Sequence, residues 1–533
     1  MSRITHLLGF SVNCTYHCPK MAMIKTYGSA VMGVSAYTIT VEVDVTPGQT
    51  GYYLVGLPDS AVKEGQQRIE AAILNSDFKY PRYKCVINMA PADIRKEGSA
   101  YDLTIAAGFL AATGQLKHEA LSRHILMGEL SLDGALKPIK GALPIAIQAR
   151  KEGYEGLLLP RANAREAALV SDLKVYGFDD LNEVVAYFND PSGFEPVQVN
   201  TRVEFFEQQS QFEVDFSDVK GQEQIKRALE IAAAGGHNVL LIGPPGAGKT
   251  MLSKRLPTIL PPLSLHEALE TTKIHSVAGK LPTQASLVAV RPFRSPHHTI
   301  SDVALVGGGG HPQPGEISLA HNGVLFLDEL PEFKRTVLEV MRQPLEERRV
   351  TISRARFTVD YPASFMLVAA MNPCPCGFYN HPDKDCICGV HNVQRYLNKV
   401  SGPLLDRIDL HVEVTPVPFN ELTDSRKSES SEVIRNRVLM ARDKQAARLG
   451  GKEISCNAQM SGNQVREFCE ISSAGMLLLK TAMERLGLSA RAYDRILKVS
   501  RTIADLSNAD SIQVEHLAEA IQYRSLDRDN WGS

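Results

Sequence analysis

Apolar and polar positions along the first 190 residues predict a domain of mixed strands and helices. Residues 37–45 alternate between apolar and polar side chains, which is typical of a strand with one buried face. We expect residues 52–55 to return beside it as a second strand, after a turn at Gly48. A third strand is predicted at residues 83–87, and helical spacing predicts helices at 60–74, 102–112, 143–151 and 181–188. We therefore expect an α+β domain over residues 1–190.

The periodicity is lost after this domain. Asp190-Pro191-Ser192-Gly193 favours a turn, and the polar residues that follow show no sustained period. We therefore place a linker at residues 191–213.

A different pattern begins at residue 214. Short continuous apolar runs stand at residues 239–242, 324–327 and 366–370. Such runs suit strands buried on both faces, as in a parallel sheet covered by helices. They predict an α/β domain over residues 214–418. Residues 419–533 are predicted to form a helical C-terminal domain, with helix ends at Gly450-Gly451 and Gly487.

The composition of the 533 residues is that of a globular protein with several domains, 44% apolar and 22% charged. With 58 Lys and Arg against 60 Asp and Glu, the formal net charge is -2, which excludes a wholly basic, nucleic-acid-coating surface but not a local basic patch. No apolar run reaches the roughly 18 residues that a membrane span needs, and no secretion signal is recognised at the N-terminus. Four of the nine cysteines fall between residues 374 and 388, which favours metal binding in a reducing cytoplasm over disulfides.

The strongest chemical signal is a phosphate-binding motif. Its residues fit G-x-x-x-x-G-K-[ST] at every fixed position, between a predicted strand and a predicted helix: Gly243, Pro244, Pro245, Gly246, Ala247, Gly248, Lys249 and Thr250. The glycines allow backbone N–H groups to surround phosphates. Lys249 is expected to contact the β- and γ-phosphates of ATP, and the Thr250 hydroxyl to bind Mg²⁺. A chance glycine-rich turn is the alternative.

Two further strands end in polar residues that suit the same site. Asp328-Glu329 follows the apolar run at 324–327, and this acidic pair can bind Mg²⁺ and polarise a water molecule. Asn372 follows the run at 366–370 and is placed to orient water against the γ-phosphate. A solvated strand end and a plain turn asparagine are the respective alternatives.

A cysteine cluster follows Asn372 directly. Cys374, Cys376, Cys386 and Cys388 form two C-x-C pairs, and two close pairs can complete a closed tetrahedral site for structural Zn²⁺. Free or buried thiols are the alternative, and His381 and His391 could substitute as ligands.

The order Lys249, Asp328-Glu329 and Asn372 resembles that of the AAA+ ATPases, whose two Walker motifs and first sensor these residues match. The resemblance implies two more catalytic residues. Arg407, in Pro403-Leu404-Leu405-Asp406-Arg407, matches the arginine finger that reaches the γ-phosphate of the neighbouring subunit, and Arg491 matches the second sensor of the helical lid. Val219-Lys220-Gly221-Gln222 resembles the segment that lies against adenine. A surface ion pair is the alternative for each arginine.

Two insertions add a resemblance to the clade of minichromosome-maintenance helicases and magnesium chelatase ATPase subunits. Residues 348–359 alternate as two strands with a basic tip at Arg354 and Arg356, and residues 294–316 contain Gly307–Gly310 and are expected to form a loop or hairpin. In the helicases such hairpins enter the central pore, which implies that Arg354 and Arg356 contact DNA phosphates. A solvated hairpin is the alternative.

The first domain resembles the Lon-type protease domain in residues 91–103, which include Ser99 at the place of its nucleophile. Gly128-Glu129-Leu130 and Pro138-Ile139-Lys140-Gly141 extend the match. However, Leu143 stands where the activating lysine of that protease belongs, and a serine without a base is a weak nucleophile. We therefore expect no peptidase activity.

The whole pattern is similar to the ComM/YifB family of magnesium-chelatase-like AAA+ ATPases. The resemblance implies a cytoplasmic, ring-forming, hexameric ATPase that uses ATP and Mg²⁺ to move along single-stranded or branched DNA, as in branch migration during natural transformation. A chelatase-like ATPase or one that remodels a protein partner is the main alternative. A non-catalytic scaffold is disfavoured because every part of the nucleotide site is present.

Overall fold

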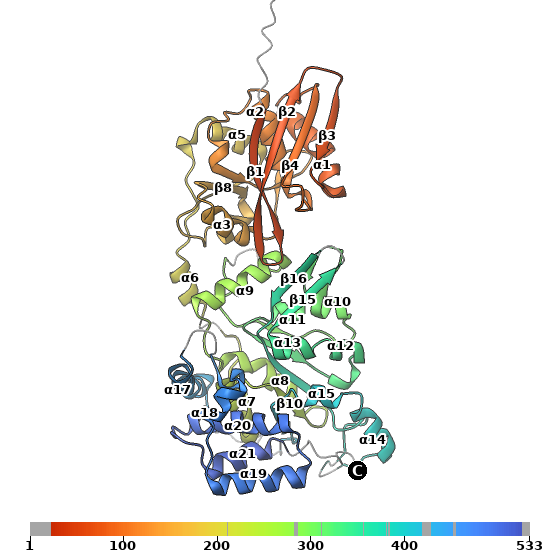
Figure 1. Ribbon diagram of the computed structural model, residues 1–533, viewed down its shortest axis with the longest axis vertical. Coiled ribbons are helices and arrows are strands. Elements are labelled where there is room, and N and C mark those ends of the chain that lie inside the picture. The colour runs from red at the N-terminus through yellow and green to blue at the C-terminus, as the bar shows by residue number, and fades with distance from the viewer. Residues whose placement is uncertain are drawn as a thin grey trace, which may run out of the picture. The chain divides into compact units, whose positions relative to one another are not determined.

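The computed structural model describes residues 23–209, 212–281, 286–310, 312–354, 357–379, 381, 384–417, 428–450 and 455–524. Two units are distinguished by their internal contacts (Figure 1). The first comprises the chain up to Val31 and residues 35–198, and the second comprises residues 32–34 and 199–533.

The first unit is built on one mixed sheet of seven strands. In spatial order these are β3 (Gly51–Val55), β4 (Lys84–Ala90), β2 (Ser35–Thr46), β1 (Ile24–Met32), β5 (His124–Leu126), β8 (Gly156–Pro160) and β9 (Lys174–Phe178). The strands from β1 to β9 in this order are paired in parallel, whereas β2 and β4 are antiparallel. The expected strands at residues 37–45, 52–55 and 83–87 are therefore confirmed.

The expected pairing of residues 52–55 with residues 37–45 is wrong. The strand β4 lies between them, paired antiparallel with β2 from Thr40 opposite Ala90 to Thr46 opposite Lys84, while β3 runs parallel to β4 at the edge of the sheet. The reason is burial. Alternate residues of β4 are fully buried, whereas Tyr53 and Val55 of β3 are more than half exposed, so β4 takes the inner position.

Five α-helices accompany this sheet, namely α1 (Ser60–Asn75), α2 (Asp102–Ala112), α3 (Ala142–Lys151), α4 (Arg161–Ala167) and α5 (Leu181–Asn189). All eleven residues of α2 are buried, including Asp102, whose carboxylate accepts hydrogen bonds from Arg68 in α1. The four expected helices in this part of the chain are confirmed to within a residue or so at each end.

The predicted linker contains a helix that the sequence pattern does not reveal. α6 (Thr201–Gln208) begins after Asn200, whose side chain accepts a hydrogen bond from the Val203 N–H. Two turns are too few to establish a period, and among residues 201–207 of this helix only Phe205 is well buried.

The second unit contains a five-stranded parallel sheet, as the apolar runs predict. Its order is β11 (Phe293–Arg294), β14 (Val324–Leu327), β17 (Met366–Met371), β10 (Val239–Ile242) and β18 (Leu410–Glu413). Every neighbouring pair is parallel. β10, β14 and β17 are buried along their whole length. Because they are adjacent and parallel, the residues that follow Ile242, Leu327 and Met371 meet at one edge of the sheet.

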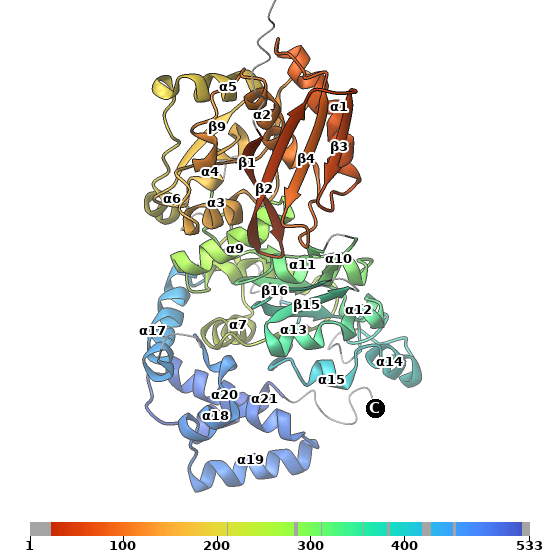
Figure 2. The ribbon, with the colours of Figure 1, turned by 45° about the horizontal axis from the view of Figure 1, so that its top comes forward.

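Both expected insertions are present in this unit. β15 (Arg349–Arg354) and β16 (Phe357–Pro362) form an antiparallel hairpin, and β12 (Gly307–Gly308) and β13 (Gln313–Pro314) form a shorter one between α10 (Asp302–Val306) and α11 (Glu316–Leu319). Figure 2 shows β15 and β16 beside α13 (Arg342–Glu347). The second insertion is thus a helix and a short hairpin rather than an open loop.

The C-terminal part is helical, as expected, and its helices gather in one bundle (Figures 1 and 2). They are α17 (Ser431–Leu449), α18 (Gly462–Phe468), α19 (Ser473–Leu486), α20 (Ala490–Leu506) and α21 (Val514–Gln522). α17 and α20 pack against α7 (Glu223–Gly235). Gly450 and Gly487 end α17 and α19 in the left-handed conformation, and Ser489 caps α20 by accepting from the Ala492 N–H. The expected boundary between residues 418 and 419 lies outside the described residues.

Within the described part of the chain, no helix combines the length and the apolar character that crossing a membrane requires.

Candidate functional site

Residues 243–248 form the loop between β10 and α8 (Lys249–Arg255), and Lys249 and Thr250 are the first two residues of that helix. Gly248 opens α8 in the left-handed conformation, with φ of 85°, which glycine adopts without strain. The Lys249 side chain is buried, and its amino group donates hydrogen bonds to the carbonyl oxygens of Gly243 at 2.6 Å and Pro244 at 3.0 Å. The lysine side chain therefore lies within the curve of the loop.

The same amino group joins the loop to the neighbouring strand β17. Lys249 Nζ lies 3.1 Å from Oδ1 of Asn372, the residue that follows the strand. Burial lowers the pKa of the Lys249 ammonium, and the Asp328 carboxylate partly opposes this shift. An anionic ligand would stabilise the charged form further, so this lysine suits a phosphate.

The acidic pair Asp328-Glu329, which follows the strand β14, is the third part of this group. Thr250 Oγ1 donates a hydrogen bond of 2.6 Å to Asp328 Oδ2, and the Glu329 N–H donates to Asp328 Oδ1 at 3.0 Å. The hydroxyl and the carboxylate are hard oxygen ligands, which suit Mg²⁺. The Glu329 side chain is exposed, and Nδ1 of His298 lies 3.3 Å from its Oε2.

His298 is a neighbour that the motifs did not reveal. It belongs to the insertion before α10, and only the pair of adjacent histidines, His297 and His298, marks the segment in the sequence. The segment around Gln222 does reach the loop: Gln222 Nε2 donates to the carbonyl oxygen of Ala247 at 2.7 Å.

The two arginines expected to act on the nucleotide lie outside this group. Arg407 is buried, forms an ion pair of 2.7 Å with Glu346, and donates to the Pro403 carbonyl at 2.6 Å. Arg491 is exposed in the first turn of α20, and its side chain makes no ion pair or hydrogen bond with any other described residue. The roles of Arg407 as arginine finger and of Arg491 as second sensor therefore remain predictions.

A buried carboxylate links the segment that carries Arg407 to the helix that carries Arg491. Asp409, which is 3% exposed, forms an ion pair with Arg495 of α20, accepts a hydrogen bond from the Asn238 N–H at 2.9 Å, and lies 3.6 Å from Nδ1 of His237. Burial would raise its pKa, but Arg495 and His237 together hold the pKa well below its usual range. The sequence motifs gave no sign of this link.

The four cysteines of the cluster come together. The sulfur atoms of Cys374, Cys376, Cys386 and Cys388 all lie within 4.8 Å of one another. Cys374 Sγ is 3.3 Å from Cys376 Sγ and 3.6 Å from Cys386 Sγ. Zinc–sulfur bonds of about 2.3 Å in a tetrahedron separate the sulfur atoms by about 3.8 Å, so the cluster can hold such a metal after small adjustments. Neither His381 nor His391 belongs to the group that the described residues form.

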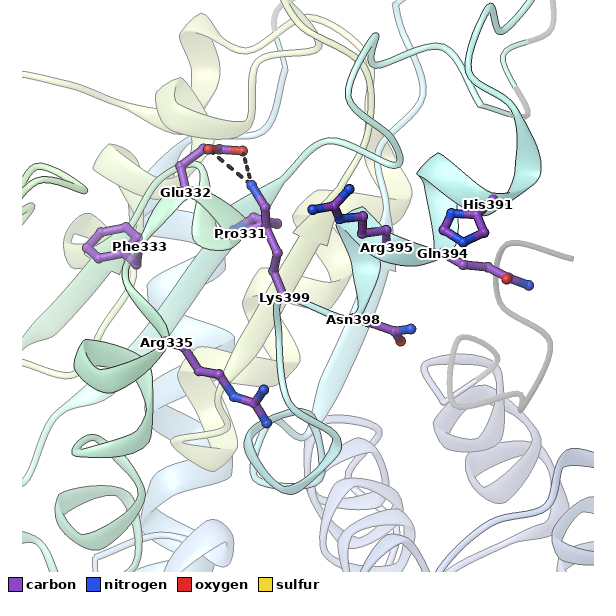
Figure 3. A pocket seen from close by; sticks show the side chains of 9 residues that line it. All are labelled: Pro331, Glu332, Phe333, Arg335, His391, Gln394, Arg395, Asn398 and Lys399. Atoms are coloured by element: carbon purple, nitrogen blue, oxygen red, sulfur yellow. Dashed lines mark hydrogen bonds and ion pairs between the residues drawn. The ribbon is translucent and has the colours of Figure 1, made fainter.

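A solvent-open hollow of about 640 Å³ lies between the turn after Glu329 and α14 (Val390–Leu397). Figure 3 shows the basic side chains of Arg335, Arg395 and Lys399 around it, with Lys399 bound to Glu332 at 3.2 Å. No residue of the 243–250 loop lines this hollow, so it is distinct from the candidate phosphate site.

The basic hairpin is described only in part. Arg354 is the last residue of β15 and is paired with Phe357 of β16, while Arg356 lies outside the described residues. The expected contact of these two arginines with DNA therefore stays a prediction.

In the first unit, the candidate nucleophile has no basic partner. The Ser99 hydroxyl donates to the carboxylate of Glu129, and Leu143 is fully buried in α3. Lys140 is exposed and makes no side-chain hydrogen bond or ion pair with any other residue that the structure describes. This arrangement gives the serine a carboxylate as its partner and no lysine base of the Lon type.

Comparison with known proteins agrees with the fold. The family profile "Magnesium chelatase, subunit ChlI" matches residues 215–422, "Subunit ChlI of Mg-chelatase" matches residues 41–163, and "Magnesium chelatase, subunit ChlI C-terminal" matches residues 428–524. YifB of Escherichia coli is 45% identical over 514 residues, and the competence protein ComM of Haemophilus influenzae is 44% identical over 519. Each alignment covers 95% of this chain and 98% of the relative. Lon protease 2 of Bacillus subtilis is 29% identical over 185 residues, 30% of this chain and 33% of that protein. The chain therefore belongs to the ComM/YifB family of magnesium-chelatase-like AAA+ proteins.

Proposed function

We propose that this protein is an ATPase whose hydrolysis site is formed by residues 243–250, Asp328, Glu329 and Asn372. The observation that carries the proposal is the convergence of three adjacent strand ends, in which Lys249 contacts Asn372 and Thr250 contacts Asp328. A glycine-rich loop, a buried lysine and an acidic pair at one edge of a parallel sheet are the parts that phosphoryl transfer from ATP requires.

Each residue has a definite part in this proposal. The loop and Lys249 bind the phosphates, and Thr250 and Asp328 hold Mg²⁺, which supplies positive charge against the phosphate oxygens when bound. Glu329 is exposed at the site and accepts a proton from the attacking water, and Asn372 orients that water. Nδ1 of His298 lies 3.3 Å from the Glu329 carboxylate, so this histidine is a further polar group beside the attacking water.

We further propose that the protein works as a closed homo-oligomeric ring, with a hexamer as the expected size. An arginine that acts on a neighbour's nucleotide requires a head-to-tail interface, and such interfaces close into rings. Arg407 takes this role after leaving Glu346, an exposed partner at the surface, and Arg491 acts as the sensor of the helical lid.

The substrate we propose is single-stranded or branched DNA. The printed name of the relative from Haemophilus influenzae, competence protein ComM, and the basic residues Arg354 and Arg356 at the end of the β15–β16 hairpin support this assignment. Hydrolysis between subunits would then move the hairpins along a strand, as in branch migration.

The second candidate is a chelatase-like ATPase, or one that remodels a protein partner. It is favoured by a specific observation: the three matching family profiles all describe a magnesium chelatase subunit. In this case ATP hydrolysis would not respond to DNA.

Two secondary proposals complete the assignment. We infer that Cys374, Cys376, Cys386 and Cys388 bind one structural Zn²⁺, which requires the thiols to stay reduced, as they do in the cytoplasm. We also infer that the first domain is Lon-protease-like but proteolytically inactive, because Ser99 is paired with an acid and Leu143 replaces the base.

The test is to measure ATP hydrolysis with and without forked, four-way and single-stranded DNA, together with branch migration on labelled four-way substrates. Stimulation of hydrolysis by DNA and ATP-dependent branch migration are expected. ATP hydrolysis that is indifferent to every DNA would support the protein-remodelling candidate, and the absence of hydrolysis under all conditions would refute the ATPase assignment.

A further inference from the structure

The loop that carries the four cysteines is attached directly to the candidate nucleotide site. Only one residue separates Asn372 from Cys374, which is fully buried and belongs to the same hydrophobic cluster as Ile242 and Met371. Ile242 immediately precedes the phosphate-binding loop, and Met371 immediately precedes Asn372. The first thiol of the cluster is therefore anchored where β10 and β17 end.

The cysteine loop also packs against the phosphate-binding loop itself. A Cβ atom at Gly377 would lie only 2.4 Å from Cδ and 2.9 Å from Cγ of Pro245, closer than non-bonded carbon atoms approach each other. Gly377 has φ of 84°, the left-handed conformation that favours glycine. The backbone of one loop thus rests on the proline ring of the other, with no room for a side chain between them.

The far end of the cysteine loop returns to the end of β17. Cys388 is followed by α14, and Tyr396 on this helix belongs to the same hydrophobic cluster as Met371 and Cys374. A metal that joins Cys374 and Cys376 to Cys386 and Cys388 would therefore link the end of β17, which Asn372 follows, to the start of α14, the helix that carries Tyr396.

In the described part of this loop, hydrophobic packing and a few local hydrogen bonds hold the chain. Between Met371 and Val390 the described residues form neither helix nor strand. The hydrogen bonds near the first cysteine are local: the Gly377 N–H donates to the Cys374 carbonyl at 3.0 Å, and the Tyr379 N–H donates to Cys374 Sγ at 3.3 Å. A loop of this length gains order mainly from a cross-link that closes it.

We propose that the metal bound by the four cysteines is a positioning element of the nucleotide site, which holds Pro245 and Asn372 in place and couples nucleotide affinity to metal occupancy. This inference rests on the proposed ATPase function. A site with four thiolate ligands has no open position, so the metal acts on the nucleotide only through the backbone of the loop. The cysteines are positioning residues and touch neither phosphate nor water.

The experiment uses the full-length protein and measures three quantities on each variant: zinc per chain by elemental analysis, the dissociation constant of a fluorescent ATP analogue with Mg²⁺, and kcat with KM for ATP. The variants are Cys386→Ser, which removes a ligand, and Gly377→Ala, which keeps all four thiols but forces the loop off Pro245. Cys85→Ser is the matched control, because Cys85 is a buried free cysteine in the first unit.

We expect about one zinc per chain in the wild type, its loss in Cys386→Ser, and its retention in Gly377→Ala. Both variants should bind the nucleotide about tenfold more weakly or worse, whereas Cys85→Ser should match the wild type in all three quantities. Weaker binding by metal-free Cys386→Ser is the result that a metal serving only its own loop would not produce, and weaker binding by Gly377→Ala with full zinc content tests the contact with Pro245 by itself.

Wild-type nucleotide affinity in metal-free Cys386→Ser, or in Gly377→Ala, would overturn the inference and leave the ATPase assignment intact. Should Cys386→Ser fail to fold, as judged by its circular dichroism, the nucleotide affinity of the wild type after removal of its zinc by a chelator decides instead. A wild-type protein that carries zinc but binds no nucleotide would instead refute the ATPase function, and the coupling with it.

Discussion

Asp409 forms an ion pair with Arg495, and this contact joins the segment that carries Arg407 to the helix that carries Arg491. Asp409 lies two residues after Arg407, and Arg495 lies one helical turn after Arg491. The two segments that carry the arginines expected to act on the nucleotide are thus connected through one buried carboxylate.

Arg495→Ala should destabilise the second unit by about 3 kcal/mol, because it leaves the Asp409 charge buried with His237 and a backbone N–H as its remaining partners. Asp409→Asn in the same background should recover part of this loss, since no charge is then stranded. Thermal unfolding of the two single variants and the double variant measures the coupling. Additive effects would show that the pair contributes nothing.

The same pair predicts a dependence on pH. The pKa of Asp409 is lowered in the folded protein, so its contribution to the free energy of unfolding is fully present above the unfolded-state pKa of about 4 and is lost as the pH falls further. The difference in melting temperature between wild type and Asp409→Asn should therefore be constant from about pH 6 to 8 and should shrink below about pH 4. A difference that grows on acidification would contradict the pairing.

Lys249→Ala should abolish nucleotide binding, whereas Glu329→Gln should bind ATP without turning it over. Lys249 lies inside the phosphate-binding loop, while Glu329 is exposed beside it and is proposed to act on the water. Equilibrium binding of labelled ATP and release of phosphate distinguish the two effects. Unchanged hydrolysis by Glu329→Gln would refute the assignment of the acidic pair.

The protein should cleave no peptide bond. Ser99 is hydrogen-bonded to Glu129, and the place of the activating lysine is occupied by the buried Leu143. Incubation of the protein with casein and ATP, followed by electrophoresis, checks this expectation. Degradation that is lost in Ser99→Ala would prove it wrong and would give the role of base to Lys140.

The double variant Arg354→Ala/Arg356→Ala should keep its basal ATP hydrolysis but no longer couple hydrolysis to movement along DNA. If both arginines contact phosphates, removing them should weaken DNA binding and lower its salt dependence by about two ions per subunit. Binding isotherms at several salt concentrations and branch-migration rates provide the measurement. A variant that migrates branches like the wild type would reduce the hairpin to a solvated loop.

Arg407→Ala should keep DNA binding and stop ATP turnover in assembled rings, because its proposed ligand belongs to the neighbouring subunit. Glu346→Gln is the matched control, since it removes the ion pair of Arg407 but not the arginine. We expect Glu346→Gln to retain hydrolysis. Equal loss in both variants, with rings intact by light scattering, would mean that the ion pair and not a finger is the function of Arg407.

The sequence predicted those features that depend on residues close together in the chain. The strands at residues 239–242 and 324–327 were evident because continuous apolar runs have one common explanation in an α/β domain. Lys249 and Asn372 were assigned to one site from the sequence, and the structure brings them into contact because β10 and β17 are adjacent and parallel.

Relationships between distant segments were not predictable in the same way. The strand order that separates residues 52–55 from residues 37–45 depends on which strand is buried more completely. The contacts of His298 with Glu329 and of Arg407 with Glu346 join segments whose sequences carry no mark of each other. Such contacts depend on how distant segments pack together in the folded chain, which no single sequence motif specifies.

The carbonyl oxygens of Gly243 and Pro244, which accept hydrogen bonds from Lys249, have a consequence for the speed of the nucleotide cycle. A phosphate that approaches this ammonium has to displace them, so the loop acts as a built-in competitor of its own ligand. The net affinity is the difference between two sets of charge-assisted hydrogen bonds, and is smaller than either set alone. If the loop binds ATP as proposed, this tethered competitor lowers the net affinity for the nucleotide, and weaker binding shortens the time that the nucleotide stays bound.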